Sequence, residues 1–310
     1  MGLGGGFMSN ILFIGGTGFL GSAIVRELAR RPASADFCFT LPTRRRDHAK
    51  HLLVLPTANV IDADVHDPAT LARLMAGQDA VISLVGVLKG GEGDPYGKGF
   101  ARAHVELPRK IAAAATAAGV RRVLHVSALQ AATAAPSGYL RSKADGEAAL
   151  LDAGLDLTIF RPSVIFGRGD AFLTLFAKMA KIAPFFPLAG ADARFQPVWV
   201  EDVAATVADS LMRADSIGAA YDLCGPTQYS LRELVSYAAA VSGHPRAIIG
   251  LPEAIAWLQA WAMEFIPNGP MTRDNVRSMR VASVCHGDCA LPFGRVATPL
   301  EVVVPTYLRG

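Results

Sequence analysis

The segment NILFIGGTGFLGSAIVREL, residues 10–28, constrains the fold of this 310-residue chain more than any other stretch. Asn10 to Ile14 have the apolar character of a buried strand, and Phe19 to Arg30 have the spacing of a helix. Gly15, Gly18 and Gly21 lie at the turn between them. Glycines at such a turn let a phosphate approach the backbone and leave the amides at the helix N-terminus free to bind it. The segment predicts a pyrophosphate-binding loop, and a tight turn without a ligand is the alternative.

Short apolar segments alternate with helix-length segments through the first half of the chain. The expected strands are Asn10–Ile14, Phe37–Leu41, Val60–Ala63, Ala80–Val85, Arg122–Val126 and Leu157–Phe160, and the expected helices are Phe19–Arg30, Ala69–Met75, His104–Ala118 and Tyr139–Ala153. Apolar strands separated by helices are typical of a parallel sheet covered on both faces. We therefore predict an α/β fold with a doubly wound parallel sheet of the Rossmann type.

The pattern changes after Arg161-Pro162, where proline-punctuated helical segments such as Ala171–Ile182 and Ser230–Ser242 follow. We predict a nucleotide-binding Rossmann domain at residues 8–165 and a smaller α/β lobe at 166–310. This lobe would bind a substrate or a partner. A late strand at Ala220–Leu223 is expected to return to the region of the sheet.

Composition limits the class of partner and the location of the protein. The net charge of +3 is too small to indicate nucleic-acid binding, so a small molecule is the expected ligand. Four widely spaced cysteines do not suggest a disulfide scaffold, so we expect free thiols in a reducing compartment. No charged residue occurs before Arg26, but the glycines of the loop disfavour a membrane span or a signal peptide. The predicted location is the cytoplasm.

The residues at the end of the second strand bear on the choice of cofactor. An acidic residue about 20 positions beyond the glycine loop would hold the ribose hydroxyls of NAD. This chain instead has Leu41-Pro42-Thr43-Arg44-Arg45, and a guanidinium suits a 2′-phosphate through charge-assisted hydrogen bonds. We therefore favour NADP(H) over NAD(H), with Arg44 as the binding residue. A solvated basic turn is the alternative and is our interpretation of Arg46.

Several motifs together resemble the extended and atypical short-chain dehydrogenase/reductase superfamily. They are GGTGFLG, Ala63-Asp64-Val65, VLHVSAL, a YxxxK pair and RPSVIFGRGD. The segments FRPSVIFGRGDAFL, FQPVWVEDVA, DNVRSMRV and PTYL further resemble the branch of the dehydrogenase-like accessory subunit of respiratory complex I and its bacterial relatives, often labelled nucleoside-diphosphate-sugar epimerases. The resemblance covers nearly the whole chain.

The resemblance also implies which residues contact the cofactor. Asp64 and Val65 would lie by the adenine, although a strand-end cap is the alternative for Asp64. Val85 and Gly86 would lie along the cofactor backbone, and Pro162 to Val164 would approach the nicotinamide. The complete set of predicted cofactor-binding residues is Gly15, Thr17, Gly18, Phe19, Leu20, Gly21, Arg44, Asp64, Val65, Val85, Gly86, Lys143, Pro162 and Val164.

Tyr139 and Lys143 are the candidate catalytic pair. They are four residues apart on one face of an expected helix that follows the VLHVSAL strand. A tyrosine with its ordinary pKa of about 10 is a poor base at neutral pH, so a neighbouring ammonium is needed to stabilise the phenolate. We predict that Tyr139 exchanges a proton with a substrate oxygen as hydride moves at carbon, while Lys143 supports it and binds the nicotinamide ribose.

Two catalytic positions depart from the superfamily pattern. Ala128 stands where a catalytic serine or threonine is usual, and Ser127 is the candidate substitute, with a locally bonded strand-end hydroxyl favoured instead. His104 stands where an asparagine is usual. It could relay a proton, but packing under the cofactor is the favoured interpretation.

Three further signals have mostly structural interpretations. Cys285-His286-Gly287-Asp288-Cys289 could suggest zinc, but a single CxxxC is weak support, so no metal is predicted and an irregular loop with free thiols is favoured. Glu201-Asp202 is expected to be structural. Trp257 and Trp261, one helical turn apart, are expected to pack within the lobe. The apolar segments 172–188 and 251–267 leave peripheral membrane association or a protein partner as the alternative.

Two functions therefore follow from the sequence. The favoured one is an NADP(H)-dependent reductase, dehydrogenase or epimerase that acts on a small polar substrate such as a nucleotide sugar. The alternative is a non-catalytic NADPH-binding accessory or assembly protein of a respiratory membrane complex.

Overall fold

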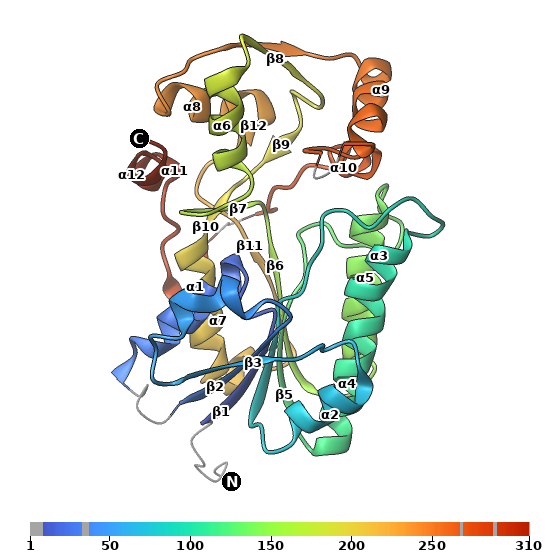
Figure 1. The fold of residues 1–310 in the computed structure, drawn as a ribbon, viewed down its shortest axis with the longest axis vertical. Coiled ribbons are helices and arrows are strands. Elements are labelled where there is room, and N and C mark those ends of the chain that lie inside the picture. Colours follow the sequence, from blue (N-terminus) through green and yellow to red (C-terminus); the bar gives the residue numbers. More distant parts are fainter. Residues whose placement is uncertain (1–8, 33–36, 267–268, 288–289, 310) are drawn as a thin grey trace.

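A seven-stranded parallel sheet forms the centre of the protein (Figure 1). The computed structural model describes residues 9–32, 37–266, 269–287 and 290–309. The strand order is β3-β2-β1-β4-β5-β6-β11. The strands are β1 (Asn10–Ile14), β2 (Cys38–Thr43), β3 (Ala58–Asp62), β4 (Ala80–Ser83), β5 (Arg122–Val126), β6 (Asp156–Pro162) and β11 (Ala220–Leu223). This is the doubly wound order, in which the chain adds strands on one side of β1 as far as β3 and then on the other side from β4. The predicted fold class is confirmed.

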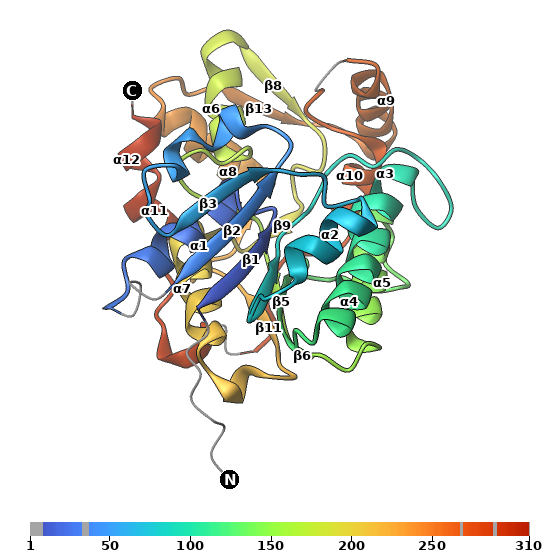
Figure 2. The same cartoon turned by 60° about the horizontal axis from the view of Figure 1, so that its bottom comes forward.

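Helices cover both faces of this sheet (Figures 1 and 2). On one face, α1 (Phe19–Ala29) packs against α7 (Val200–Leu211). On the other face lie α2 (Pro68–Met75), α4 (Leu107–Ala118) and α5 (Gly138–Leu151). A 3₁₀ segment, Arg46–Leu52, follows β2, and α3 (Lys98–Phe100) leads into a π-helical turn, Ala101–Glu106, that continues into α4.

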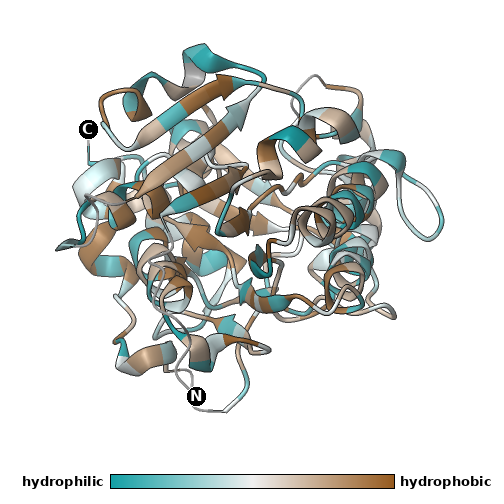
Figure 3. Ribbon diagram, turned by 90° about the horizontal axis from the view of Figure 1, so that it is seen from below, coloured by the Kyte–Doolittle hydropathy of each residue, from teal (hydrophilic) through white to brown (hydrophobic). Residues whose placement is uncertain are grey.

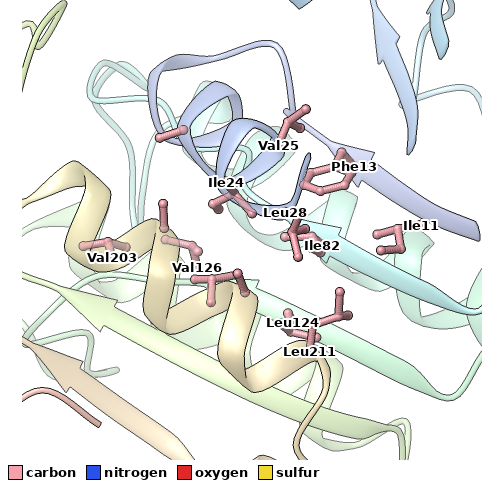
Figure 4. Packing of buried hydrophobic residues seen from close by; sticks show 14 of the residues in the cluster. Ile11, Phe13, Ile24, Val25, Leu28, Ile82, Leu124, Val126, Val203 and Leu211 are labelled. Atoms are coloured by element: carbon pink, nitrogen blue, oxygen red, sulfur yellow. The ribbon is translucent and has the colours of Figure 1, made fainter. Parts of the chain in front are cut away.

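The main core lies between the sheet and the pair α1 and α7. Phe13 of β1, Ile24 and Leu28 of α1, Ile82 of β4 and Leu211 of α7 are all essentially inaccessible to solvent (Figure 4). Burial of each such side chain contributes about 1.5–3 kcal/mol. In Figure 3 brown, apolar stretches run along several strands between the helices. The core therefore includes α7 from the second half of the sequence.

The remaining elements form a smaller region above the sheet in Figure 1. Three two-stranded sheets pair β7 (Ile165–Phe166) with β10 (Val198–Trp199), β9 (Arg194–Phe195) with β12 (Tyr229–Ser230), and β8 (Phe185–Leu188) with β13 (Ala247–Gly250). Its helices are α6 (Leu173–Ile182), α8 (Leu231–Val241), α9 (Glu253–Glu264), α10 (Arg273–Ser278), α11 (Leu300–Val303) and α12 (Pro305–Leu308). The 3₁₀ turns Ala214–Ser216 and Pro292–Gly294 lie instead beside the main sheet, where Ser216 accepts a hydrogen bond from Arg122 of β5 and the Phe293 ring contacts Tyr221 of β11. Within this second half, β11 pairs in parallel with β6 at the edge of the main sheet.

The observed bounds differ slightly from the predicted ones. β1, β5 and β11 begin and end as predicted. β4 stops at Ser83, which pairs with Ile14 as the last residue of the register between β4 and β1. β6 extends to Pro162 because β11 pairs with it that far. The helix predicted from His104 begins earlier, in the π-helical turn.

A disulfide contradicts the prediction of free thiols. Cys224, just after β11, is bonded to Cys285, which follows α10 in the sequence. The prediction failed because the two cysteines are 61 positions apart and only the fold brings them together. Cys38 is free and exposed, and Cys289 lies outside the described residues. The inference of a reducing compartment therefore loses its support.

The apolar segment at the N-terminal end is not a membrane helix. Its residues from Ile11 to Val25 form most of β1, the glycine loop and the first part of α1. Among the helices of the described residues, none combines the length and the hydrophobicity that a bilayer crossing requires.

Candidate functional site

The loop between β1 and α1 requires glycine at several positions for its own packing. Gly15 has a φ of +92°, in the left-handed region that favours glycine. A Cβ at Gly21 would lie 2.6 Å from the Gly15 carbonyl oxygen, and one at Gly16 would lie 2.6 Å from Phe13 Cβ. By contrast, Gly18 is exposed, and a Cβ there would approach only the Gly15 carbonyl oxygen, at 3.3 Å. The surface is therefore open at Gly18.

Helix α1 presents its N-terminus at this opening. Its N-cap is Gly18, which provides no side-chain cap, and its first turn contains no acidic residue. The helix dipole and the first-turn amides of Phe19, Leu20 and Gly21 are therefore available to an anion. This arrangement is the one that a pyrophosphate needs.

The carboxyl ends of β2 and β3 lie beside the loop. The Thr17 hydroxyl donates a 3.5 Å hydrogen bond to Thr43 Oγ1, and the Ala63 amide donates to the Thr43 carbonyl at 3.0 Å. Arg44 follows Thr43, is exposed, and forms no ion pair within the described ranges. Asp64 accepts a hydrogen bond from the His66 amide, which fits the strand-end cap considered for it. Within the described part of the chain, a cation without an acidic partner thus lies directly after β2, where the sequence predicted it.

The ends of β4 and β1 meet close to Lys143. A Cβ built on Gly15 would lie 3.2 Å from the Val85 amide nitrogen, and one on Gly86 would lie 3.4 Å from Lys143 Nζ. The structure therefore brings together the glycine loop, Val85, Gly86 and Lys143. Pro162 is the last residue of β6, which pairs with β5, and Val164 lies two residues beyond it.

Helix α5 holds Tyr139 and Lys143 and is anchored at its N-terminus from outside the sheet. Asp274 of α10, itself only 5% exposed, accepts hydrogen bonds from the amides of Gly138 (2.7 Å) and Tyr139 (3.0 Å). Ser137 caps the helix through the amide of Leu140. Sequence reasoning missed Asp274, which appeared only within the DNVRSMRV motif.

Burial governs the protonation of the pair. Lys143 is buried and donates a 3.2 Å hydrogen bond to the Val126 carbonyl. Burial lowers the pKa of Lys143 to about 8, while nearby Glu147 opposes that shift. Burial also raises the pKa of Tyr139 to about 12. Tyr139 is therefore a neutral phenol at pH 7 in the protein alone.

Ser127 contradicts the prediction of a locally bonded hydroxyl. Its Oγ is buried and has no hydrogen-bond partner among the described residues. An unpaired buried hydroxyl costs about 1–3 kcal/mol, so a ligand that bonded it would recover free energy. Its neighbour Ala128 lies in an apolar cluster with Ala135, Leu140 and Tyr139, and supplies no hydroxyl.

His104 is held in a structural hydrogen-bond network. Its Nε2 accepts from the Val87 amide at 3.0 Å, and its Nδ1 lies 2.9 Å from Ser142 Oγ. The Ser142 hydroxyl donates to the Tyr139 carbonyl, which leaves its oxygen to accept from His104 Nδ1–H. Burial, together with Lys143 and His125, lowers the pKa of His104 to about 2. Both ring nitrogens are occupied, so the geometry does not support the proton-relay hypothesis.

The cysteine segment 285–289 and the acidic pair Glu201-Asp202 are the next two sequence signals that the structure bears on. Cys285 is in the disulfide and cannot supply a zinc thiolate, and Asp288 and Cys289 lie outside the described residues. The acidic pair is structural, since Asp202 accepts from the amide and hydroxyl of Thr298 and Glu201 pairs with Arg26.

The two tryptophans of α9 differ in their surroundings. Trp257 is half-buried beneath the guanidinium groups of Arg273 and Arg277. Trp261 is 46% exposed and contacts the ring of Phe265, so the prediction that both pack within the lobe is wrong for Trp261. Its indole lies on the solvent side of the helix because Ala256 and Ala260 form the buried side.

Comparisons with known proteins place this chain among NAD(P)H-binding proteins. A family model described as NAD(P)H-binding matches residues 15–173. Mitochondrial NADH dehydrogenase [ubiquinone] 1 alpha subcomplex subunit 9 of Rattus norvegicus is 30% identical over 305 residues, which cover 95% of this chain and 78% of that protein.

Solved structures of low sequence identity share the fold. An NADPH-dependent quinone oxidoreductase of Escherichia coli, complexed with NADPH, has a TM-score of 0.74 at 23% identity and covers 96% of this chain and 99% of its own. A dTDP-glucose 4,6-dehydratase of Streptomyces venezuelae, with NAD and TYD bound, has a TM-score of 0.75 at 20% identity. The match covers 96% of this chain and 95% of the dehydratase chain. The fold is thus found with either nucleotide.

Proposed function

Because this chain belongs to the NAD(P)H-binding, short-chain dehydrogenase/reductase-like family, on the branch of the respiratory accessory subunit, we propose that it holds NADP(H) as a structural ligand within a respiratory NADH dehydrogenase. The observation that carries this proposal is the state of the reactive groups. Ala128 supplies no hydroxyl where a catalytic one is usual, and both ring nitrogens of His104 are already hydrogen-bonded. The similarity to the rat subunit along nearly the whole chain supports the same conclusion.

The described residues fit a dinucleotide. The open surface at Gly18 and the uncapped start of α1 would receive the pyrophosphate, and the unpaired Ser127 hydroxyl would gain a partner. Lys143 uses one of its three N–H groups on Val126, so others remain for the nicotinamide ribose. Asp64, Val65, Val85, Gly86, Pro162 and Val164 complete the proposed contact set.

The position of Arg44 supports NADP(H) over NAD(H). Its guanidinium is exposed at the end of β2, without an acidic partner in the described part of the chain. A 2′-phosphate there would form charge-assisted hydrogen bonds, whereas the hydroxyl of NAD(H) would gain little from the cation.

Arg44→Asp is expected to weaken NADPH binding by at least about tenfold, because one attractive contact of about 1.4 kcal/mol becomes a repulsive one. NADH binding should change much less. Isothermal titration of both nucleotides into both proteins measures this, with Arg46→Asp as the matched control on the adjacent turn. Tighter binding of NADH than NADPH by the unmodified protein would show that the cofactor preference is wrong.

A second candidate function is a reductase or epimerase that uses the same nucleotide. The Lys143 ammonium retains unused hydrogen-bonding capacity beside Gly86, and the buried Ser127 hydroxyl has no partner among the described residues, which favours it. In a reduction, the bound nucleotide would supply hydride to a carbonyl carbon. Tyr139, a neutral phenol at pH 7, would give its proton to the carbonyl oxygen, and Lys143 would stabilise the phenolate that remains.

Tyr139→Phe separates the two functions. An enzyme that relies on the phenol should lose about 10²–10⁴-fold in its rate of NADPH oxidation, because the proton donor is gone. A structural ligand should be oxidised equally slowly by both proteins. The measurement is NADPH absorbance in the loaded proteins after addition of a panel of sugar nucleotides, ketones and quinones. A large rate difference on any substrate would overturn the structural-ligand proposal.

A further inference from the structure

A cavity of about 450 Å³ lies between the glycine-rich segment after β4 and the pair α9 and α10. This volume falls within the range of small-molecule sites, about 300–1,000 Å³. Its apolar lining consists of Phe100, Met263, Phe265, Ile266 and Met271. Phe265 is 72% exposed and Ile266 56% exposed at its rim. Exposed apolar side chains at the edge of a cavity are typical of a ligand site.

The charges around this cavity balance. Glu264 is bound by Arg273, and Glu92 is bound by Arg277 through two hydrogen bonds. The two remaining charged lining residues are Lys89, whose ammonium donates to the Gly269 carbonyl, and Asp274, which accepts the α5 amides. A diphosphate would require an excess of positive charge that this lining does not offer. The ligand that matches it is neutral.

Two lining residues also contact Tyr139. Asp274 accepts the Tyr139 amide, and the Phe100 ring lies edge-on to the Tyr139 ring at a centroid distance of 6.0 Å. Asp274 and Phe100 therefore lie between the cavity and Tyr139, the first at its backbone amide and the second at its ring. A molecule bound there would rest on the same two groups that position Tyr139.

We propose that this cavity binds a neutral, largely apolar molecule that carries one carbonyl or hydroxyl oxygen. Methionine and phenylalanine side chains provide adaptable apolar contact for its body. Lys89 retains N–H groups beyond the one given to Gly269, and these can donate to the ligand oxygen. This class differs from the polar nucleotide sugar expected from the sequence. The proposal does not depend on whether nucleotide is bound.

The test uses Nile red, a neutral apolar dye with one carbonyl oxygen, and the full-length protein. We expect saturable one-to-one binding, detected by fluorescence, with displacement by 2-undecanone and none by UDP-glucose. Phe265→Asp should weaken binding at least about tenfold, because it places a charge at the rim. Leu258→Asp is the matched control, since Leu258 is 62% exposed on α9, whose C-cap is Phe265, and does not line the cavity.

Both substitutions replace exposed side chains, and thermal unfolding together with NADPH titration should match the unmodified protein. This separates failure of the cavity from failure of the nucleotide site. Unsaturable dye binding, displacement by UDP-glucose, or equal affinity of Phe265→Asp and Leu258→Asp would each overturn the proposal.

Discussion

Gly21→Ala is expected to reduce NADPH binding by at least about 100-fold and to lower the free energy of unfolding by about 1–3 kcal/mol. The added Cβ would lie 2.6 Å from the Gly15 carbonyl oxygen, Gly16 Cα and the Gly16 carbonyl oxygen. All three are backbone atoms, so the clash can be relieved only by moving the loop. That movement displaces the amides at the start of α1 from the pyrophosphate position. Isothermal titration and urea unfolding measure the two effects.

Gly18→Ala is the matched control for the loop. Its Cβ would meet only the Gly15 carbonyl oxygen, at 3.3 Å, and would otherwise enter open space. Its stability should remain within about 0.5 kcal/mol of the unmodified protein. If Gly18→Ala lost NADPH affinity at unchanged stability, the added methyl group would occupy space that the nucleotide itself needs. Normal NADPH binding by Gly21→Ala would contradict the location of the site.

Asp274→Ala is expected to lower the free energy of unfolding by about 2–5 kcal/mol. The buried carboxylate accepts the amides of Gly138 and Tyr139, and each donor left without a partner costs about 1–3 kcal/mol. The loss should also free the N-terminal turn of α5. Urea unfolding gives the total, and hydrogen exchange at these two amides should accelerate first.

Asp192→Ala controls for loss of an aspartate from the same region. Its side chain is 95% exposed, and its carboxylate lies 4.0 Å from Arg232, so its removal should cost less than about 1 kcal/mol. Asp274→Asn should recover part of the loss, because its amide oxygen can still accept one of the two bonds. If Asp274→Ala and Asp192→Ala were equally stable, α10 would not anchor the helix of Tyr139.

The parts of the fold that the sequence predicted are those fixed by local pattern. β1 is apolar from Ile11 to Ile14, and β5 is buried at every position with apolar residues at Val123, Leu124 and Val126, so both strands could be recognised from a few residues. The glycines at 15, 16, 18 and 21 marked the loop because only glycine fits close backbone contacts such as that of Gly21. Local spacing also placed Tyr139 and Lys143 on one helix.

Contacts between distant segments could not be predicted in the same way. Asp274 reaches the Tyr139 amide across 135 positions, and Cys285 reaches Cys224 across 61. The use of both nitrogens of His104 depends on Val87 and Ser142, which a pattern along one helix does not connect. Exposure of Trp261 follows from which side of α9 the lobe covers. Each of these features exists only after the chain has folded.

The central claim is that the nucleotide is held as a structural ligand, and its content in the purified protein tests this most directly. The protein would be isolated under mild conditions together with its partners, and the nucleotide released by denaturation would be identified and counted. We predict about one NADPH per chain, still reduced after incubation with small metabolites from the same cells, and co-purification with subunits of a respiratory NADH dehydrogenase. Rapid oxidation of the NADPH by a metabolite, with no such subunit recovered, would contradict the claim.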